Sequence, residues 1–586
     1  LLLVDSSALL LRRSLFNAGY ADAVVKSSTE VDDTTRVANV QFAVNPKWRA
    51  TVSKIVITGN DKIHERTIRR SITFKEGDIY RLRDLNRSLR NLYESNLFRR
   101  ASIQTVSGDS AKVVSVMVQE APLRSMRSSL GFNTIDFFQT EERFTQFNFF
   151  GGARRLELRG VIGNLGAPQL QNSRIFRKPD TRGDNSYLQP TFELSADITQ
   201  PWFAGSNNSL GASAFAHRRS AAGIFVDNGF GTSATFTRQI SDKVPLVANY
   251  RFEISKVSAG DVYFCQFFGV CEVGVIGALR EAHRLSPVSL SFFADRSDDI
   301  FKPRAGFVTR AEIEHANSYT LSDYHYVRAS GEFTKYWAIG RTMSLATRAG
   351  MGYVRSLAST GSAVGGDAAT GREIIHPRKR FYAGGSQSVR GYGENQLGPR
   401  ILTIDPALLF TVDTNLSKAP VCEHTAGGGV ACPQQRIDDI QSASYQPRPL
   451  GGSSLLEGNI ELRMPLDNLL KNLGGALFVD GAFVGEGALS AIARGKGAVT
   501  PGAGLRYYSS AGAIRIDLGI RPTLREQLSV VTEVTDPLRN QSQIVTVKSL
   551  ETGTDVTKSY TALGGHGFLS QIFDRLQLHL SIGQAF

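Results

Sequence analysis

One glycine-rich segment has residue types suited to fixing a loop against charged partners. It runs from Arg380 to Arg400 and reads RFYAGGSQSVRGYGENQLGPR. Its candidate functional residues are Gly384, Gly385, Val389, Arg390, Gly391 and Tyr392. Glycines allow positive φ angles and close backbone approach, and a guanidinium can bind two carboxylates through its fork of donors. The chemistry indicated here is ionic binding by Arg390.

The four cysteines form two close pairs, Cys265 with Cys271 and Cys422 with Cys432. Neither pair has CxxC spacing, and we predict that each forms a disulfide that closes a short loop in an oxidising compartment. The sequence contains no P-loop, no GxSxG and no HExxH motif. We therefore predict no enzyme activity, no cofactor and no metal site.

The first 121 residues combine helical and strand patterns. Ser6–Ala18 has helical periodicity and ends at Gly19, and residues 1–51 are interpreted as part of a domain. Residues 52–121 predict a compact α+β module of strand, helix, helix, strand and strand. Its elements are expected at Val52–Thr58, His64–Ile72, Leu82–Ser95, Ala101–Val106 and Lys112–Gln119.

From about Leu123 onward, short strands alternate apolar and polar residues between turn signals. Asn459–Met464, Ile514–Ile520 and Leu576–Phe586 each place apolar residues on one face. Alternation alone fits either a soluble sandwich or a membrane barrel. Residues 122–586 would accommodate about sixteen membrane-crossing strands of about ten residues each. Long polar loops are expected at 163–185, 356–380 and 402–450.

The glycine-rich segment resembles the loop-six signature of the BamA/TamA superfamily of outer-membrane assembly proteins. The match consists of FYAGG at 381–385, VRGY at 389–392 and Gly398-Pro399. Residues 52–121 resemble a POTRA domain, and 1–51 resemble most of a preceding one. The resemblance covers nearly the whole chain. It implies α+β POTRA domains followed by a transmembrane antiparallel β-barrel of about sixteen strands.

The resemblance also implies the partners of Arg390. In the family, loop six folds back into the barrel lumen, where its arginine rests against acidic residues of the inner wall. Glu461 in NIELRMP and Asp480 in FVDGA match those positions, so we expect the Arg390 guanidinium within hydrogen-bond reach of one or both. Ala482 stands where the family usually has glycine.

A lateral seam is expected where the first strand, near Arg124–Thr134, meets the terminal strand. The first strand is poor in β-formers, and a glycine interrupts the last. The final aromatic resembles an outer-membrane sorting signal. The predicted seam and sorting residues are Ser128, Ser129, Gly131, Gly583 and Phe586. The alternative is an ordinary closed barrel whose serines face the lumen.

These features predict an outer-membrane protein assembly factor. POTRA domains in the periplasm would receive unfolded outer-membrane protein clients, and the barrel would insert them into outer-membrane lipid through its seam. Periplasmic chaperones, accessory lipoproteins and an inner-membrane partner are candidate partners. The location would be the outer membrane of a Gram-negative-type bacterium, with both disulfide loops extracellular.

Charge and domain content separate this function from others. The net charge of +13 is spread along the chain without a nucleic-acid motif, so it favours lipid head groups and no nucleic acid is expected. One alternative is a two-partner secretion exporter of the same superfamily. Another is a passive structural barrel, although such a pore has no use for a POTRA module.

Overall fold

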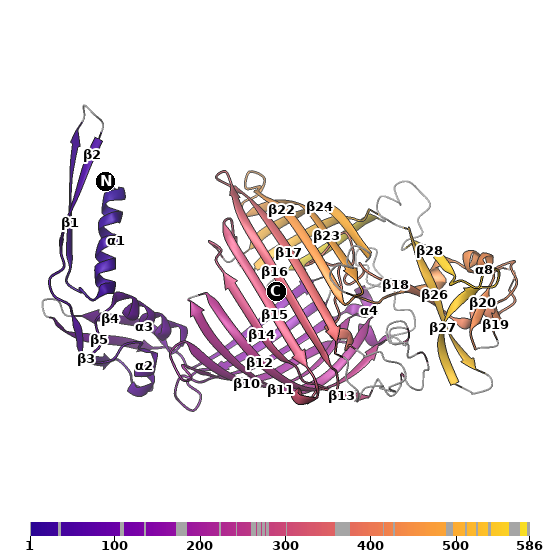
Figure 1. The fold of residues 1–586 in the computed structure, drawn as a ribbon, viewed down its shortest axis with the longest axis horizontal. Helices are drawn as coiled ribbons and strands as arrows, with labels where there is room; N and C mark the ends of the chain where they lie inside the picture. The colour runs from indigo at the N-terminus through magenta and orange to yellow at the C-terminus, as the bar shows by residue number, and fades with distance from the viewer. Residues whose placement is uncertain are drawn as a thin grey trace. The chain divides into compact units, whose positions relative to one another are not determined.

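A computed structural model gives the fold as two compact units, described separately here (Figure 1). The first unit comprises Leu1–Met126, Phe144–Leu158 and Ala196–Ala212, and the second comprises the rest. The structure describes residues 2–32, 37–105, 110–133, 136–170, 185–221, 224–241, 243–259, 265, 271, 276, 281–299, 302–357, 375–413, 415–425, 428–487, 496–509, 512–522, 525–536, 541–561 and 575–582.

The chain begins with a helix and a two-stranded ribbon. Helix α1 spans Leu2–Ala18 and is followed by Gly19 at φ +105°, a conformation that favours glycine after a helix. Strands β1 (Val24–Asp32) and β2 (Val37–Asn45) pair antiparallel along their whole length. The predicted helix is confirmed, and it starts four residues earlier than its periodicity indicates.

The next module has the predicted order of elements. They are β3 (Thr51–Thr58), α2 (Glu65–Ser71), α3 (Leu82–Glu94), β4 (Phe98–Thr105) and β5 (Ala111–Glu120). Strand β5 lies between parallel β3 and antiparallel β4. Leu85 and Leu92 of α3 are buried with Val114 and Val116 of β5, so an amphipathic helix covers the sheet.

Most strands from β6 onward form a closed antiparallel barrel (Figure 1). Its strands are β6 (Arg124–Asn133), β7 (Phe137–Gln146), β8 (Arg155–Leu165), β9 (Thr191–Pro201), β10 (Asn208–Ala221), β11 (Phe225–Ser241), β12 (Val244–Ala259), β13 (Ala282–Leu285), β14 (Val288–Asp295), β15 (Gly306–Ala316), β16 (Tyr326–Ile339), β17 (Met343–Ser356), β22 (Ser454–Pro465), β23 (Leu473–Gly485), β24 (Lys496–Ser509), β25 (Gly512–Ile520) and β29 (Leu576–Ile582). Strands β13 and β14 both pair with β12 and share one position, so the described residues give sixteen strand positions. No helix among the described residues is long and apolar enough to cross a membrane.

The alternation in the strands points its apolar side outward. On β22, Leu456 and Ile460 are 43% and 55% exposed, whereas Glu457 and Glu461 are each 7% exposed. A soluble sandwich would bury the apolar face instead. The closed barrel with an apolar exterior and a charged interior therefore resolves the ambiguity in favour of a membrane barrel.

Two long connections at one end of the barrel fold together into a second sheet, which we call the cap. Its strands are β18 (Arg400–Ile404), β19 (Glu423–His424), β20 (Val430–Cys432), β21 (Tyr445–Pro449), β26 (Arg525–Asp536), β27 (Gln541–Ser549) and β28 (Thr557–Thr561). Its helices are α7 (Pro406–Phe410) and α8 (Gln434–Asp439). The remaining short elements are α4 (Ala167–Leu170), η1 (Asn185–Leu188), η2 (Ser318–Thr320), η3 (Pro377–Lys379) and η4 (Ser442–Ser444).

The cap differs from the sequence-based expectation. Residues 402–450 are not one polar loop, and the strands in 525–561 do not cross with the barrel. The two segments pair with each other, since Leu402–Ile404 of β18 runs parallel to Val530–Thr532 of β26. Alternation identifies a strand but not its pairing partner, and the partner here lies more than a hundred residues away.

Both predicted disulfides are confirmed at this end of the molecule. Cys265 bonds Cys271 and Cys422 bonds Cys432, with Cα separations of 4.2 Å and 4.3 Å. Cys422 and Cys432 lie in the buried core of the cap. The first disulfide contacts the cap strand β27, because Ile544 N donates to the carbonyl oxygen of Cys271 at 2.8 Å.

We predict that the native protein contains no reactive thiol. A thiol-specific alkylating reagent, applied to the denatured but unreduced protein, should add no mass. The same reagent should add four labels after reduction, because all four cysteines are paired. Labelling before reduction, read by mass spectrometry, would show that one or both bridges do not form.

Candidate functional site

The glycine-rich segment folds into the barrel as a compact hairpin-like loop. Ala383 bridges to Leu397, and Gly385 N donates to Tyr392 O at 3.0 Å. Gly384 and Gly385 have φ angles of 104° and 102°, which side chains other than glycine rarely adopt. The two glycines therefore let the chain reverse direction before Val389 and Arg390.

Gly391 allows the loop to approach the barrel wall. A Cβ atom there would collide with the Thr500 side chain of β24. On the wall itself, a Cβ at Gly519 of β25 would collide with the backbone of Arg390. Gly391 therefore leaves room for the Thr500 side chain, and Gly519 lets the Arg390 backbone lie against the wall.

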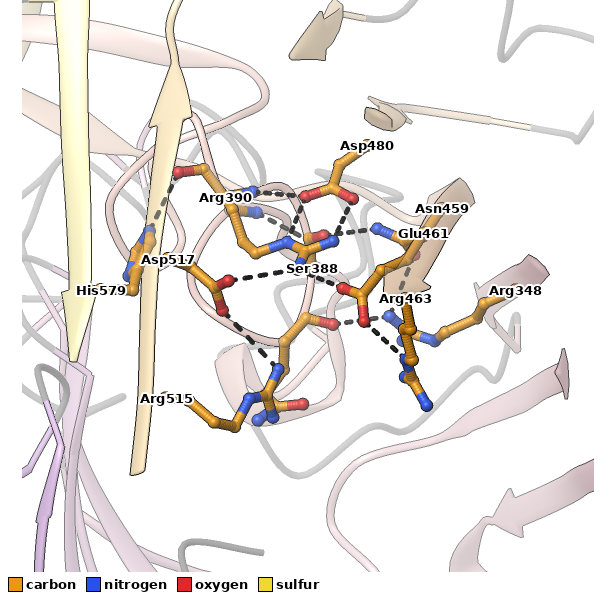
Figure 2. A network of polar contacts seen from close by, with 12 residues as sticks. Arg348, Ser388, Arg390, Asn459, Glu461, Arg463, Asp480, Arg515, Asp517 and His579 are labelled. Carbon is orange, nitrogen blue, oxygen red and sulfur yellow. Dashed lines mark hydrogen bonds and ion pairs between the residues drawn. The ribbon is translucent and has the colours of Figure 1, made fainter. Parts of the chain in front are cut away.

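Arg390 binds both acidic residues that the sequence assigns to it, as Figure 2 shows. Its Nε and Nη2 donate to Oδ2 and Oδ1 of Asp480 at 2.7 Å and 2.8 Å, and its Nη1 donates to Glu461 Oε2 at 2.6 Å. The Arg390 backbone N–H also donates to Asp480, at 3.1 Å. The predicted contact is confirmed, with Asp480 held bidentately.

The contact between Arg390 and its carboxylates is almost fully buried. The Asp480 side chain is 0% exposed and the Arg390 side chain 6%. The Phe478 ring covers the guanidinium, with its centroid 3.4 Å from Cζ. Burial of this degree makes each partner depend on the other, because an isolated buried charge is costly.

Three further residues of the site were not identified from the sequence. Asp517 of β25 lies 3.7 Å from Arg390, and Arg506 of β24 donates to Asp517 at 2.6 Å. His579 of β29 lies 3.1 Å from the carbonyl oxygen of Arg390, so its Nε2 donates there (Figure 2). The alternation in β25 and β29 puts Asp517 and His579 opposite the apolar faces of their strands, and the two residues are paired in the β25–β29 register.

The other motif residues form a small apolar core beside the ion pairs. Val389 and Tyr392 are 0% and 4% exposed and pack with Ala482 and Val484 of β23. Ala482, at the place of the usual glycine, stays within the regular β22–β23 ladder opposite Glu457. The substitution therefore adds a methyl group to this core without disturbing the strand.

The predicted seam residues lie partly within the described chain. Ser128, Ser129 and Gly131 lie in β6, and Ser128 donates to Glu142 of β7 at 2.5 Å. Gly583 and Phe586 lie outside the described residues.

Family comparisons match both parts of the chain. Residues 148–529 match the model of the Omp85 superfamily domain, and residues 50–121 match the POTRA model, described as a surface antigen variable number repeat. The outer membrane protein assembly factor BamA of Nitratidesulfovibrio vulgaris is 21% identical over 385 residues, which cover 65% of this chain and 43% of the relative. BamA of Neorickettsia risticii is 24% identical over 418 residues, covering 69% and 48%. This chain thus spans less than half the length of these relatives.

A solved structure has the same fold. BamA from Haemophilus ducreyi lacking POTRA domains 1–3 aligns with a TM-score of 0.58 at 15% sequence identity. The alignment covers 98% of this chain and 92% of that one. The expected POTRA-plus-barrel architecture is therefore confirmed.

Replacing Arg390 by alanine should destabilise the folded protein by about 3 kcal/mol, because it leaves Asp480 and Glu461 buried without their main cation. The measurement is the midpoint of urea unfolding in vesicles, read by the mobility of unheated protein on gels. Loop six, our name for residues 375–399 between β17 and β18, should also become accessible to protease.

Arg463→Ala is the matched control, since Arg463 also pairs with Glu461 but has a side chain 37% exposed. Its loss should cost no more than about 1 kcal/mol. Equal losses for the two variants would contradict a special role for Arg390.

Proposed function

This chain belongs to the Omp85 superfamily, and we propose on that premise that it inserts unfolded proteins into the outer membrane through a seam in its barrel wall. It is an outer-membrane protein whose POTRA domain lies in the periplasm. The proposal follows the name of its curated relatives, which are outer membrane protein assembly factors.

The observation that carries the proposal is the short ladder between the first and last barrel strands. Within the described part of the chain, β6 and β29 pair at only two positions, Asn133 with Ser581 and Phe132 with Ile582. On its other side, β29 pairs with β25 at seven positions. Among the described residues, the ladder that closes the barrel is therefore shorter than the ladder on the other side of β29.

Strand β6 has the features of an edge that another strand could join. Its residues Arg124–Leu130 are exposed, and Met126 and Leu130 are 72% and 83% exposed. A strand edge in lipid needs partners for its backbone N–H and C=O groups, because no water is available to bond them. An incoming client strand would form these hydrogen bonds with β6. Strand β6 would in turn fix the client segment in an extended conformation.

Client delivery is assigned to the N-terminal domains. In the POTRA sheet, β3 and β4 are the outer strands, so either could bind an extended client segment by β-augmentation. We propose that residues 1–51 are part of a preceding POTRA-like domain and that residues 122–586 form the barrel with its cap. Periplasmic chaperones, accessory lipoproteins and an inner-membrane partner are proposed to interact with this part.

The proposed insertion involves no chemical step. The free energy would come from pairing and burial of the client strands in the bilayer rather than from a bound nucleotide or metal ion. Gly131 and Gly583 are proposed to keep the seam weak, and Phe586 to act as the sorting residue. The Arg390 anchor is proposed to keep loop six in the lumen during insertion.

The seam can be tested with a cysteine pair at Asn133 and Ser581, which face each other across it. After oxidation, the Asn133→Cys/Ser581→Cys protein should lose insertion of a barrel client into proteoliposomes, because β6 can no longer separate from β29. A reductant should restore insertion.

A pair in a fully paired ladder provides the control. Lys335→Cys with Thr347→Cys cross-links β16 to β17 away from the seam and should leave insertion unchanged, oxidised or reduced. If the seam-locked protein inserts clients as well as the unlocked one, lateral opening is not the mechanism.

A further inference from the structure

Three consecutive basic residues directly precede the loop-six motif, and each binds an acidic partner on the barrel. Arg378 binds Asp227 and Glu253, Lys379 binds Glu314, and Arg380 forms an ion pair with Glu486. These acidic partners come from different strands of the barrel. Asp227 is in β11, Glu253 in β12, Glu314 in β15, and Glu486 directly follows β23.

The Arg378 cluster is the most buried of the three. Nη1 donates to Asp227 Oδ2 at 2.6 Å, and Nη2 donates to Glu253 Oε1 at 2.9 Å. The side chains of Asp227, Glu253 and His217 are all 0% exposed. His217 Nε2 lies 3.2 Å from Nη1 and 3.4 Å from Asp227 Oδ2, so the imidazole completes the cluster.

The three partners of Arg378 have the composition of a metal site. A ligand atom from each of His217, Asp227 and Glu253 lies within 4.8 Å of the other two. Imidazole and carboxylate lone pairs that converge in this way bind a cation. Here the Arg378 guanidinium lies among these three side chains. It takes the place that a metal ion would have, so the cation comes from the loop itself.

This second anchor uses a different part of the wall from the first. Arg390 binds residues of β22 and β23, whereas Arg378 binds residues of β11 and β12. The two arginines lie twelve positions apart along the chain. The segment between them therefore has its two ends held on separate parts of the wall.

Apolar residues around the second anchor form a buried cluster at the end of the barrel that carries the cap. Ile375 and Phe381 flank the basic residues and belong to one buried cluster with Val257 of β12 and Tyr326 of β16. Val531, from the cap, belongs to the same cluster. A continuous apolar core thus joins strand ends, loop six and the cap.

A cavity of about 660 Å³ with several charged residues in its lining lies against this core. Its lining includes Arg310, Glu332 and Arg348 from the barrel wall, together with Phe381 from the apolar cluster. Phe381 therefore belongs both to the cavity lining and to the core that closes the long-loop end.

We propose that Arg378 is a positioning residue that seals the outer end of the lumen against solutes, as a second ionic anchor independent of Arg390. The seal is a barrier function distinct from client insertion. Without Arg378, the carboxylates of Asp227 and Glu253 would face each other in a dry site, and their repulsion would favour a wetted, displaced loop.

The test is the conductance of the full chain reconstituted in planar bilayers. Arg378→Ala should raise the frequency of large openings at least about tenfold, because losing one partner of a buried ion pair shifts such an equilibrium by more than that. Arg378→Lys, which keeps one positive charge, should give an intermediate frequency. An opening frequency equal to that of the wild type would overturn the proposal.

Arg284→Ala is the matched control. Arg284 of β13 forms an ion pair with Asp323 at the same end of the barrel, but its side chain is 51% exposed and its described hydrogen bonds go to Asp323. It should conduct like the wild type. An increase equal to that of Arg378→Ala would show that any charge loss at this end opens the lumen, which would overturn the specific role of Arg378.

A cross-link tests the seal even if Arg378→Ala does not fold. Lys379 and Glu314 form an ion pair at 2.7 Å, so Lys379→Cys with Glu314→Cys can be joined by a short bifunctional thiol reagent. In otherwise wild-type protein the link should abolish the rare large openings, and in Arg378→Ala it should restore closure. Openings that persist in the linked protein would contradict the proposal.

Discussion

The contact of Arg390 with Asp480 and Glu461 is the interaction on which the arrangement of loop and barrel depends. Asp480 faces the lumen only in one register, because a slip by one residue would turn it toward lipid. The guanidinium in turn would be costly to bury without both carboxylates. Strand register and loop position therefore specify each other, and the Phe478 ring completes the enclosure of the charge.

The described backbone pairs and buried ion pairs are unevenly distributed around the barrel. Loop six is fixed to β11, β12, β22 and β23, where the ladders are long and the ion pairs are buried. Between β6 and β29, the described residues give two ladder pairs. His579 connects β29 to the carbonyl oxygen of Arg390. A change at the seam could thus reach the loop through one hydrogen bond.

The sequence predicts local features well and distant pairings less well. The POTRA elements, the alternation of β22 and β25, and the partners of Arg390 follow from periodicity and from a specific motif. Asp517 is a charge on the polar face of its strand, and nothing in the local sequence says which arginine it meets. Arg378 lies outside the motif, and its partners in β11 and β12 are more than a hundred residues earlier, so no spacing rule connects them.

The cap sheet has a consequence for the order in which the chain can fold. Strand β18 and strand β26 pair in parallel, and Thr532 Oγ1 donates to Ile404 O across a separation of 128 residues. Such non-local pairing carries a large loop-closure entropy, so it forms late unless other structure brings the ends together. Strands β22 to β25 lie between the two segments in sequence. We therefore expect the cap to assemble after β22 to β25 have folded into the wall, because these strands bring its two segments together.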